Sequence, residues 1–177
     1  MSYFDFSKQY KGIADVFLRR PEYYRPLLSF LETVMIGPSK LSKIDRELLA
    51  AYVSKLNGCH FCVEAHQATL KYLGANEALV KSLDGEIDTN LVSEQVAALL
   101  IFARRLTENP QSVTQQHITF LKYAGLDEQT IEDGMNVIAL FGLVNRLVDA
   151  VGVTGDDKYF DLVGKALATH GYAKLLG

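Results

Sequence analysis

Residues 42–74 read SKIDRELLAAYVSKLNGCHFCVEAHQATLKYLG and contain both cysteines of the chain, Cys59 and Cys62. His66 follows the second cysteine by four residues, and Glu47 precedes the first by twelve. No other segment combines a nucleophile, a base and an acid at such short spacing. This stretch therefore directs the search for both the fold and the chemistry.

The pattern of this stretch predicts two helices joined by a sharp reversal. Ser42 and Asp45 have the spacing of a capping box, with Asp in place of the usual Glu. A helix is expected to start there and to run to about Leu56, where Asn57-Gly58 ends or bends it. One side of this helix is predicted to carry Ile44, Leu48, Ala51, Tyr52 and Leu56.

The second helix is expected to run to Leu73, with either cysteine in its first turn and Gly74 as a left-handed cap. Because the chain reverses, residues about 11 positions before and after the turn face each other, at a rise of about 1.5 Å each. Glu47 is therefore predicted to lie near the turn of helix that contains His66 and Thr69. We hypothesise that Glu47 orients and polarises His66, which in turn serves Cys62.

The two cysteines have the surroundings of reactive thiols. Cysteine reacts as the thiolate, so its reactivity follows its pKa. A thiol in the first turn of a helix feels the positive end of the dipole, which favours Cys59 as the attacking residue. His66 at i+4 can share a proton with Cys62, which favours Cys62 instead, so the order of attack stays open. Such a dithiol can form a sulfenic acid with a peroxide and resolve it to a disulfide.

The same residues also permit simpler interpretations. Two cysteines in a helical protein can be buried, inert thiols. A structural zinc site needs four Cys or His ligands, and only the two cysteines and His66 are well placed, so no metal is expected. His60 points elsewhere on a helix, and His117 and His170 are isolated. Glu47 without its spacing to the cysteines is an ordinary helix residue.

The composition indicates a soluble cytoplasmic protein with one domain over residues 1–177. Of its 177 residues 49% are apolar, and the net charge is −3 without a basic stripe, so no nucleic acid or membrane partner is expected. No apolar run reaches the roughly 18 to 20 residues that cross a bilayer, and the N-terminus lacks a signal-peptide pattern. The CxxC spacing indicates redox chemistry or a metal site, and no dinucleotide or P-loop motif predicts a cofactor.

The rest of the chain shows almost no strand-like alternation, so the predicted fold class is all-α. An N-terminal lead-in is expected over about residues 1–25. A helix is predicted from about Arg25 to Met35, with Pro26 in its first turn. The polar residues 84–90 are predicted to form a loop. Further helices are expected at residues 76–83, 93–107, 114–123, 127–151 and 156–173.

An internal repeat is visible in the chain. Residues 66–77 (HQATLKYLGANE) match residues 117–128 (HITFLKYAGLDE) at a constant offset of 51. In both copies a helix ends at a glycine, and an Asn or Asp then starts the next helix. This pattern predicts a repeated helical unit, with the second copy at about 93–153. Unrelated amphipathic helices can also look alike. At the same offset Glu47, Cys59 and Cys62 become Ala98, Pro110 and Val113.

The chain resembles the alkyl hydroperoxidase D (AhpD)-like, carboxymuconolactone decarboxylase superfamily in the spacing Glu47-x11-Cys59-x2-Cys62-x3-His66. Residues 45–66 (DRELLAAYVSKLNGCHFCVEAH) and 141–152 (FGLVNRLVDAVG) are similar to its peroxidase-related branch. The resemblance covers about residues 21–152. It implies an AhpD-like helical fold with a repeated unit, assembled as a dimer, trimer or hexamer.

The resemblance also implies roles for the four residues. Cys62 corresponds to the peroxide-reactive cysteine and Cys59 to the resolving one, with Glu47 and His66 as a proton relay. The founding enzyme has a histidine directly before its second cysteine, whereas here the histidine is His60, one place earlier. One residue rotates a helical side chain by about 100°, so the participation of this histidine is left for the structure to decide.

Three functions compete at this point. The leading one is an antioxidant thiol peroxidase that reduces hydrogen peroxide or organic hydroperoxides and takes electrons from an external thiol reductant. The second is a carboxymuconolactone decarboxylase-type lyase, which needs no cysteine pair and should survive Cys59→Ser and Cys62→Ser. The third is a non-enzymatic, redox-responsive oligomer whose assembly changes when the two cysteines form a disulfide. The CxxC pair favours the first.

Overall fold

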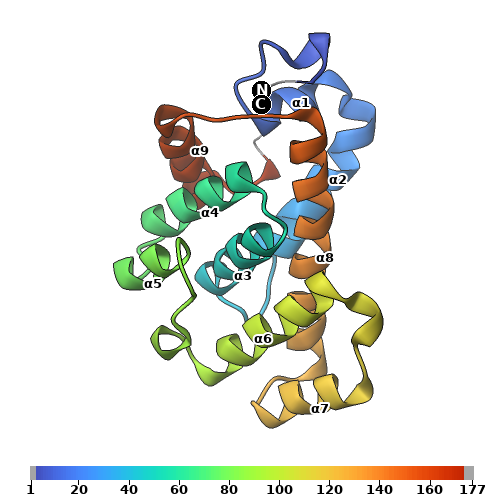
Figure 1. The fold of residues 1–177 in the computed structure, drawn as a ribbon, viewed down its shortest axis with the longest axis vertical. Coiled ribbons are helices and arrows are strands. Elements are labelled where there is room, and N and C mark those ends of the chain that lie inside the picture. The colour runs from blue at the N-terminus through green and yellow to red at the C-terminus, as the bar shows by residue number, and fades with distance from the viewer. Residues whose placement is uncertain (1–2, 174–177) are drawn as a thin grey trace.

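A computed structural model describes residues 3–173, and every regular element in this range is helical (Figure 1). The predicted all-α fold class is therefore confirmed. The α-helices are α1 (Ile13–Arg19), α2 (Pro21–Ile36), α3 (Lys43–Leu56), α4 (His60–Tyr72), α5 (Glu77–Ser82), α6 (Glu94–Glu108), α7 (Gln115–Tyr123), α8 (Glu128–Val151) and α9 (Asp157–His170). Short 3-10 helices span Asp5–Ser7, Thr89–Leu91 and Pro110–Ser112.

Helix α3 lies at the centre, with α4, α6 and α8 packed around it (Figure 1). Its residues 46–54 are all buried, so neighbours cover more of the helix than the one apolar side that the sequence predicts. Three of these residues, Arg46, Glu47 and Ser54, are polar, and each makes hydrogen bonds to partners inside the protein. Buried polar groups need such partners, and Glu47 and Ser54 form part of the site described below.

Helix α8 is long and apolar because it runs along the core. Ten of its residues are buried, and α2, α3 and α6 pack against it. By length and composition alone it is the one helix within residues 3–173 that could cross a bilayer. In this structure its apolar side chains are used in helix packing.

The N-terminal part is more helical than the sequence predicts. Within the expected lead-in of about residues 1–25, α1 forms and buries Phe17 in the core. Helix α2 begins at Pro21 and not at about Arg25, so Pro26 lies inside the helix instead of in its first turn. Pro21 itself occupies the first helical position, where the missing N–H of a proline is harmless. Two nearby prolines give the same start signal, and the sequence alone does not distinguish them.

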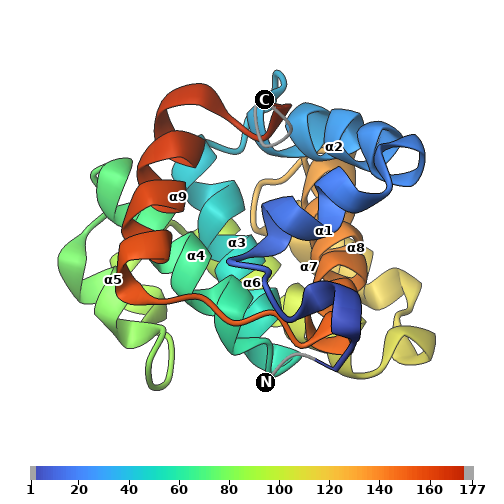
Figure 2. The ribbon, with the colours of Figure 1, turned by 90° about the horizontal axis from the view of Figure 1, so that it is seen from above.

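The C-terminal segment turns back toward α2. Helix α9 ends at His170, three residues earlier than predicted, because Gly171 adopts a φ of +73°. Glu32 Oε2 then accepts hydrogen bonds from the backbone N–H of Tyr172 at 2.6 Å and of Ala173 at 2.9 Å. Seen from above, α9 and α1 both lie on the near side of α3 and α4 (Figure 2). Helix α9 packs on α4, the helix that carries the cysteines, and Tyr172 and Ala173 lie beside α2.

The helical repeat is visible in the element boundaries. Helices α3 and α6 begin 51 residues apart, α4 and α7 end 51 residues apart, and α5 and α8 begin 51 residues apart. Gly74 and Gly125, which follow the matched helix ends, both have positive φ, at 76° and 90°. The two copies differ at the start of the second helix, where the second copy has the 3-10 helix Pro110–Ser112. The helix turn that carries the cysteines is therefore confined to the first copy.

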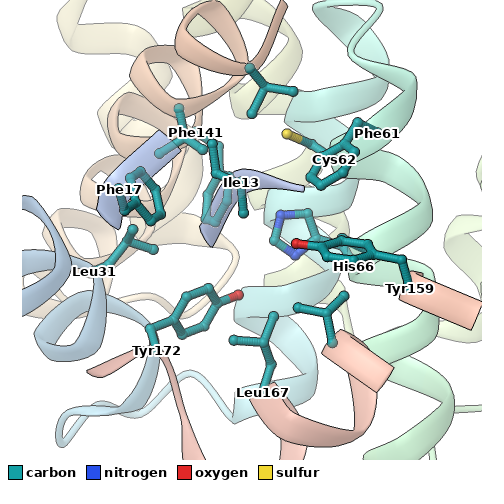
Figure 3. Close-up of a pocket in the computed structure, with 14 residues that line it drawn as sticks. Ile13, Phe17, Leu31, Phe61, Cys62, His66, Phe141, Tyr159, Leu167 and Tyr172 are labelled. Atoms are coloured by element: carbon teal, nitrogen blue, oxygen red, sulfur yellow. The ribbon is translucent and has the colours of Figure 1, made fainter. Parts of the chain in front are cut away.

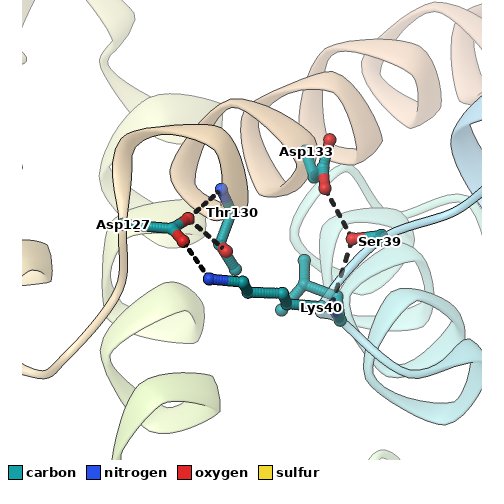
Figure 4. Close-up of polar contacts among 6 residues, drawn as sticks. Ser39, Lys40, Asp127, Thr130 and Asp133 are labelled. Carbon is teal, nitrogen blue, oxygen red and sulfur yellow. Dashed lines mark hydrogen bonds and ion pairs between the residues drawn. The ribbon is translucent and has the colours of Figure 1, made fainter.

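Polar contacts tie the loop between α2 and α3 to the start of α8 (Figure 4). Ser39 Oγ donates to Asp133 Oδ2 at 2.5 Å, and Lys40 pairs with Asp127. Asp127 also caps α8 by accepting a hydrogen bond of 2.8 Å from the N–H of Thr130. These contacts from Lys40 and Thr130 hold the pKa of the Asp127 carboxyl below its usual range. These contacts hold the loop that leads into α3 against the start of α8.

Candidate active site

The turn between α3 and α4 places both cysteines at one end of a helix. Asn57 ends α3, and Gly58 follows with a φ of +73°, a left-handed conformation that favours glycine. Cys59 is then the N-cap residue of α4, and Cys62 is the third residue of that helix. Both thiols lie near the positive end of the helix dipole.

A buried network of polar side chains holds this turn against α8. Asn57 Nδ2 donates to Asn145 Oδ1 at 2.9 Å, and Asn145 Nδ2 donates to Ser54 Oγ at 2.9 Å. Ser54 Oγ donates in turn to the carbonyl oxygen of Ala50 at 2.8 Å. Asn145 and Ser54 are fully enclosed, so these bonds replace those to water. The position of Cys59 is therefore coupled to the long core helix.

Glu47 and His66 meet in the interior. Glu47 Oε2 lies 2.6 Å from His66 Nδ1, and both side chains are buried. The reversal at Gly58 thus brings the two residues together, as their spacing predicts. A carboxylate only accepts hydrogen bonds, so Nδ1 carries the hydrogen and Nε2 is left to accept a proton. Phe141 packs edge-on against the imidazole with ring centroids 4.4 Å apart, which fixes the ring from a second side.

Tyr172 joins this pair and is not identified by the sequence analysis. Its hydroxyl donates to Glu47 Oε1 at 2.7 Å, and its side chain is buried. Burial and then the neighbouring Glu47 raise the pKa of Tyr172 well above its usual value, so the hydroxyl remains a donor. Tyr172 comes from beyond α9, and no spacing in the sequence relates it to Glu47.

The two cysteines are buried free thiols with different surroundings. The pKa of Cys59 is raised because its thiol hydrogen-bonds to Cys62, because it is buried, and because a second negative charge beside Cys62 is unfavourable. Cys59 therefore stays protonated at neutral pH. Only Cys62 of the two lines the cavity beside His66.

That cavity has a volume of about 40 Å³, room for about one water molecule or a small reactant (Figure 3). Its polar groups are the Cys62 thiol, the His66 imidazole and the hydroxyl-bearing side chains of Tyr159 and Tyr172. Helices α1 and α9 contribute walls, so both ends of the chain help to cover the thiol. The apolar residues that line it include Ile13, Phe17, Leu31, Phe61, Phe141 and Leu167.

His60 lies outside this cluster. Its side chain is 86% exposed and lies 4.0 Å from Glu64, on the outer side of α4. The shift of one residue relative to the family's histidine turns this side chain toward solvent. Within residues 3–173, no group of three or more His, Cys, Asp or Glu side chains is arranged to hold a metal ion.

The family resemblance is confirmed by comparison with known proteins. Residues 21–104 match the sequence profile of the carboxymuconolactone decarboxylase family. This matched stretch contains Glu47, both cysteines and His66.

Two curated relatives show how far the similarity extends. The "Uncharacterized protein YdfG" of Bacillus subtilis is 25% identical over 114 residues, which are 64% of this chain and 78% of that protein. The "Alkyl hydroperoxide reductase AhpD" of Rhodococcus erythropolis is 36% identical over 73 residues, which are 39% of this chain and 41% of that protein. The chain thus spans less than half the length of the AhpD relative that it matches.

A solved structure shares the fold. The uncharacterized peroxidase-related protein from Silicibacter sp. TM1040 superposes with a TM-score of 0.74 at 24% identity, over 84% of this chain and 78% of that chain. The predicted AhpD-like helical fold is therefore confirmed.

Proposed function

We propose that this chain, whose residues 21–104 match the carboxymuconolactone decarboxylase family, is a thiol-dependent peroxidase with an antioxidant role. Its substrates are hydrogen peroxide or small organic hydroperoxides. The observation that carries the proposal is that Cys62 and His66 line one cavity while Glu47 holds the imidazole from behind. The relative named as an alkyl hydroperoxide reductase supports an oxidoreductase at the level of the family.

The first step is the attack of the Cys62 thiolate on one peroxide oxygen. An S–O bond forms and the O–O bond breaks, so Cys62 becomes a sulfenic acid. The other oxygen leaves with the electron pair and takes up a proton, which gives an alcohol or water. The cavity has room for about one water molecule, so the charges in this step are stabilised mainly by fixed groups of the protein.

His66 moves the proton in this step. Its Nε2 accepts the proton of the Cys62 thiol and returns it to the leaving oxygen. Glu47 holds Nδ1 at 2.6 Å and stabilises the imidazolium that forms. No direct hydrogen bond joins the thiol to the imidazole within the described residues, so a water molecule or the peroxide itself bridges them in the cavity.

Cys59 completes the cycle. It attacks the Cys62 sulfenic sulfur, an S–S bond forms, and water leaves with the proton of the Cys59 thiol. The raised pKa of Cys59 supports this order, because the residue that stays protonated is the one that reacts second. An external dithiol then reduces the disulfide and is itself oxidised to a disulfide.

The test is a turnover assay with dithiothreitol as the reductant and hydrogen peroxide or cumene hydroperoxide as the oxidant. The wild-type protein is expected to consume peroxide, and Cys62→Ser is expected to lose this activity. Cys59→Ser is expected to turn over slowly, because only the external thiol remains to resolve the sulfenic acid. The exposed His60→Ala serves as the matched control and is expected to keep the wild-type rate.

Absence of cysteine-dependent turnover would contradict the peroxidase proposal. Decarboxylation of a carboxymuconolactone that survives both serine variants would identify a lyase instead. A change of elution volume between reduced and oxidised protein, without peroxide turnover, would identify the redox-responsive oligomer.

A further inference from the structure

The Tyr159 hydroxyl is a buried polar group without a partner. Within residues 3–173, three buried side-chain atoms lack a hydrogen bond, and they are Arg46 Nε, Thr107 Oγ1 and Tyr159 Oη. Of the three residues, Tyr159 is the one that lines the cavity beside Cys62. A buried hydroxyl without a partner is unfavourable for folding. Its presence here therefore indicates a hydrogen bond to a molecule that binds in the cavity.

The surroundings of Tyr159 fix the direction of this hydroxyl. The ring packs against Phe61 and Phe160, with centroid separations of 5.6 and 5.8 Å. The hydroxyl end lies against the backbone of Gly12, where an added Cβ would come within 2.0 Å of the oxygen. In Figure 3 the hydroxyl is directed toward the His66 ring, and both residues line the cavity.

Burial raises the pKa of Tyr159 to about 12, although the N–H groups of Ile13 and Ala14 at the start of α1 partly offset this rise. Those N–H groups approach the oxygen without completing a hydrogen bond. The hydroxyl is therefore a neutral donor whose hydrogen is not committed to any described group.

We propose that Tyr159 is a catalytic residue that donates a hydrogen bond to the leaving oxygen of a hydroperoxide bound between Cys62 and His66. This proposal rests on the proposed peroxidase function and names a group that touches the substrate. When the Cys62 thiolate attacks the nearer oxygen, the S–O bond forms and the O–O bond breaks. The farther oxygen takes the electron pair, accepts the Tyr159 hydrogen bond and receives its proton from the His66 imidazolium, so Tyr159 keeps its own proton.

Tyr159 is the suitable donor because the other hydroxyl of the cavity is occupied. Tyr172 gives its hydrogen to Glu47 at 2.7 Å, and releasing it would leave a buried carboxylate oxygen without a partner. The remaining walls of the cavity are apolar apart from Cys62 and His66. A peroxide held there therefore finds its free hydroxyl donor at Tyr159.

The test compares Tyr159→Phe with the wild type and with Tyr72→Phe. Tyr72 is the last residue of α4, and its side chain also contacts α9. Its hydroxyl donates a hydrogen bond of 2.6 Å to Asp161 at the surface. Two reactions of Cys62 are followed in each reduced protein, in a Cys59→Ser background. One is oxidation by hydrogen peroxide, and the other is alkylation by iodoacetamide, which has no oxygen leaving group.

Tyr159→Phe is expected to slow the reaction with peroxide about 10- to 100-fold, as loss of a donor to a developing oxyanion does. Its alkylation rate is expected to stay within about two-fold of wild type, and its melting temperature to be unchanged or higher, because an unpaired buried hydroxyl is removed. Tyr72→Phe is expected to leave both rates unchanged.

An equal loss in both reactions would overturn the proposal, because Tyr159 would then act on the thiol and not on the leaving oxygen. An unchanged peroxide rate would also overturn it while leaving the peroxidase function intact. A wild-type protein that reacts with peroxide no faster than free cysteine, yet is alkylated normally, would overturn the peroxidase function itself and the role of Tyr159 with it.

Discussion

Tyr172 donates a hydrogen bond of 2.7 Å to Glu47 Oε1, although 125 residues separate the two in sequence. The other oxygen of the same carboxylate lies 2.6 Å from His66 Nδ1. Glu47 therefore links the C-terminal segment to the helix that carries the cysteines. Glu32 holds that segment in place through the backbone N–H groups of Tyr172 and Ala173. The candidate site is thus completed by a part of the chain far from its sequence motif.

Tyr172→Phe tests this link through stability. The substitution leaves a buried Glu47 oxygen without its donor, so we expect the free energy of unfolding to fall by about 1–3 kcal/mol. Urea unfolding measures the change, and Tyr72→Phe at the surface is the control, expected within about 0.5 kcal/mol of wild type. Tyr159→Phe removes an unpaired hydroxyl, so it is not expected to lower the free energy of unfolding as Tyr172→Phe does. Equal effects of Tyr172→Phe and Tyr159→Phe would contradict the hydrogen-bond assignment.

Glu47→Gln tests the orientation of the imidazole. The amide keeps the size of the side chain but removes the negative charge that stabilises the His66 imidazolium. We therefore expect oxidation of Cys62 by hydrogen peroxide to slow by about ten-fold or more. Glu64→Gln, on the outer side of α4, is the control and is expected to keep the wild-type rate. A peroxide rate within two-fold of wild type in Glu47→Gln would remove Glu47 from the relay.

Stability is expected to depend on pH through Cys59. Its folded pKa is raised, so the folded state keeps a proton that the unfolded chain loses above about pH 8.5. The contribution is therefore fully present below that pH and is lost progressively as the pH rises above it. Urea unfolding between pH 7 and pH 10 measures this loss, which is expected to be smaller in Cys59→Ser. Identical pH profiles of the two proteins would show that Cys59 is not responsible.

The network around Asn145 is expected to behave as a unit. Asn145→Ala and Ser54→Ala each leave a buried polar partner unsatisfied, so each is expected to lower the free energy of unfolding by about 1–3 kcal/mol. The double variant is expected to lose less than the sum, by about 0.5 kcal/mol or more, because the shared hydrogen bond is counted twice. Strict additivity in a double-mutant cycle would show that the two side chains stabilise the turn independently.

Much of the fold can be predicted from the sequence because its signals are local. Ser42, Asn76 and Ser93 cap the helices that they are predicted to start, and Gly74 ends a helix with a positive φ. The meeting of Glu47 with His66 also follows from local information, since a single tight turn separates their two helices. Caps, turn residues and helical spacing act over a few residues, and the sequence displays them directly.

The parts that escape prediction depend on contacts between distant segments. The two tyrosines of the cavity, Tyr159 and Tyr172, are placed by α9 and by the chain beyond it, and their spacing from Cys62 carries no signal. The start of α2 depends on a choice between Pro21 and Pro26 that tertiary packing makes. The outward position of His60 is the exception, because a shift of one residue on a helix is enough to predict a different face.

The measurement that tests the central proposal most directly is a single turnover of the reduced protein with one equivalent of hydrogen peroxide. Thiol loss and intact mass are followed over time in the wild type, Cys59→Ser and Cys62→Ser. We expect rapid loss of two thiols with a mass decrease of two hydrogens in the wild type, a sulfenic acid trapped on Cys62 in Cys59→Ser, and no rapid phase in Cys62→Ser. Thiols that react no faster than free cysteine at the same pH would contradict the proposal.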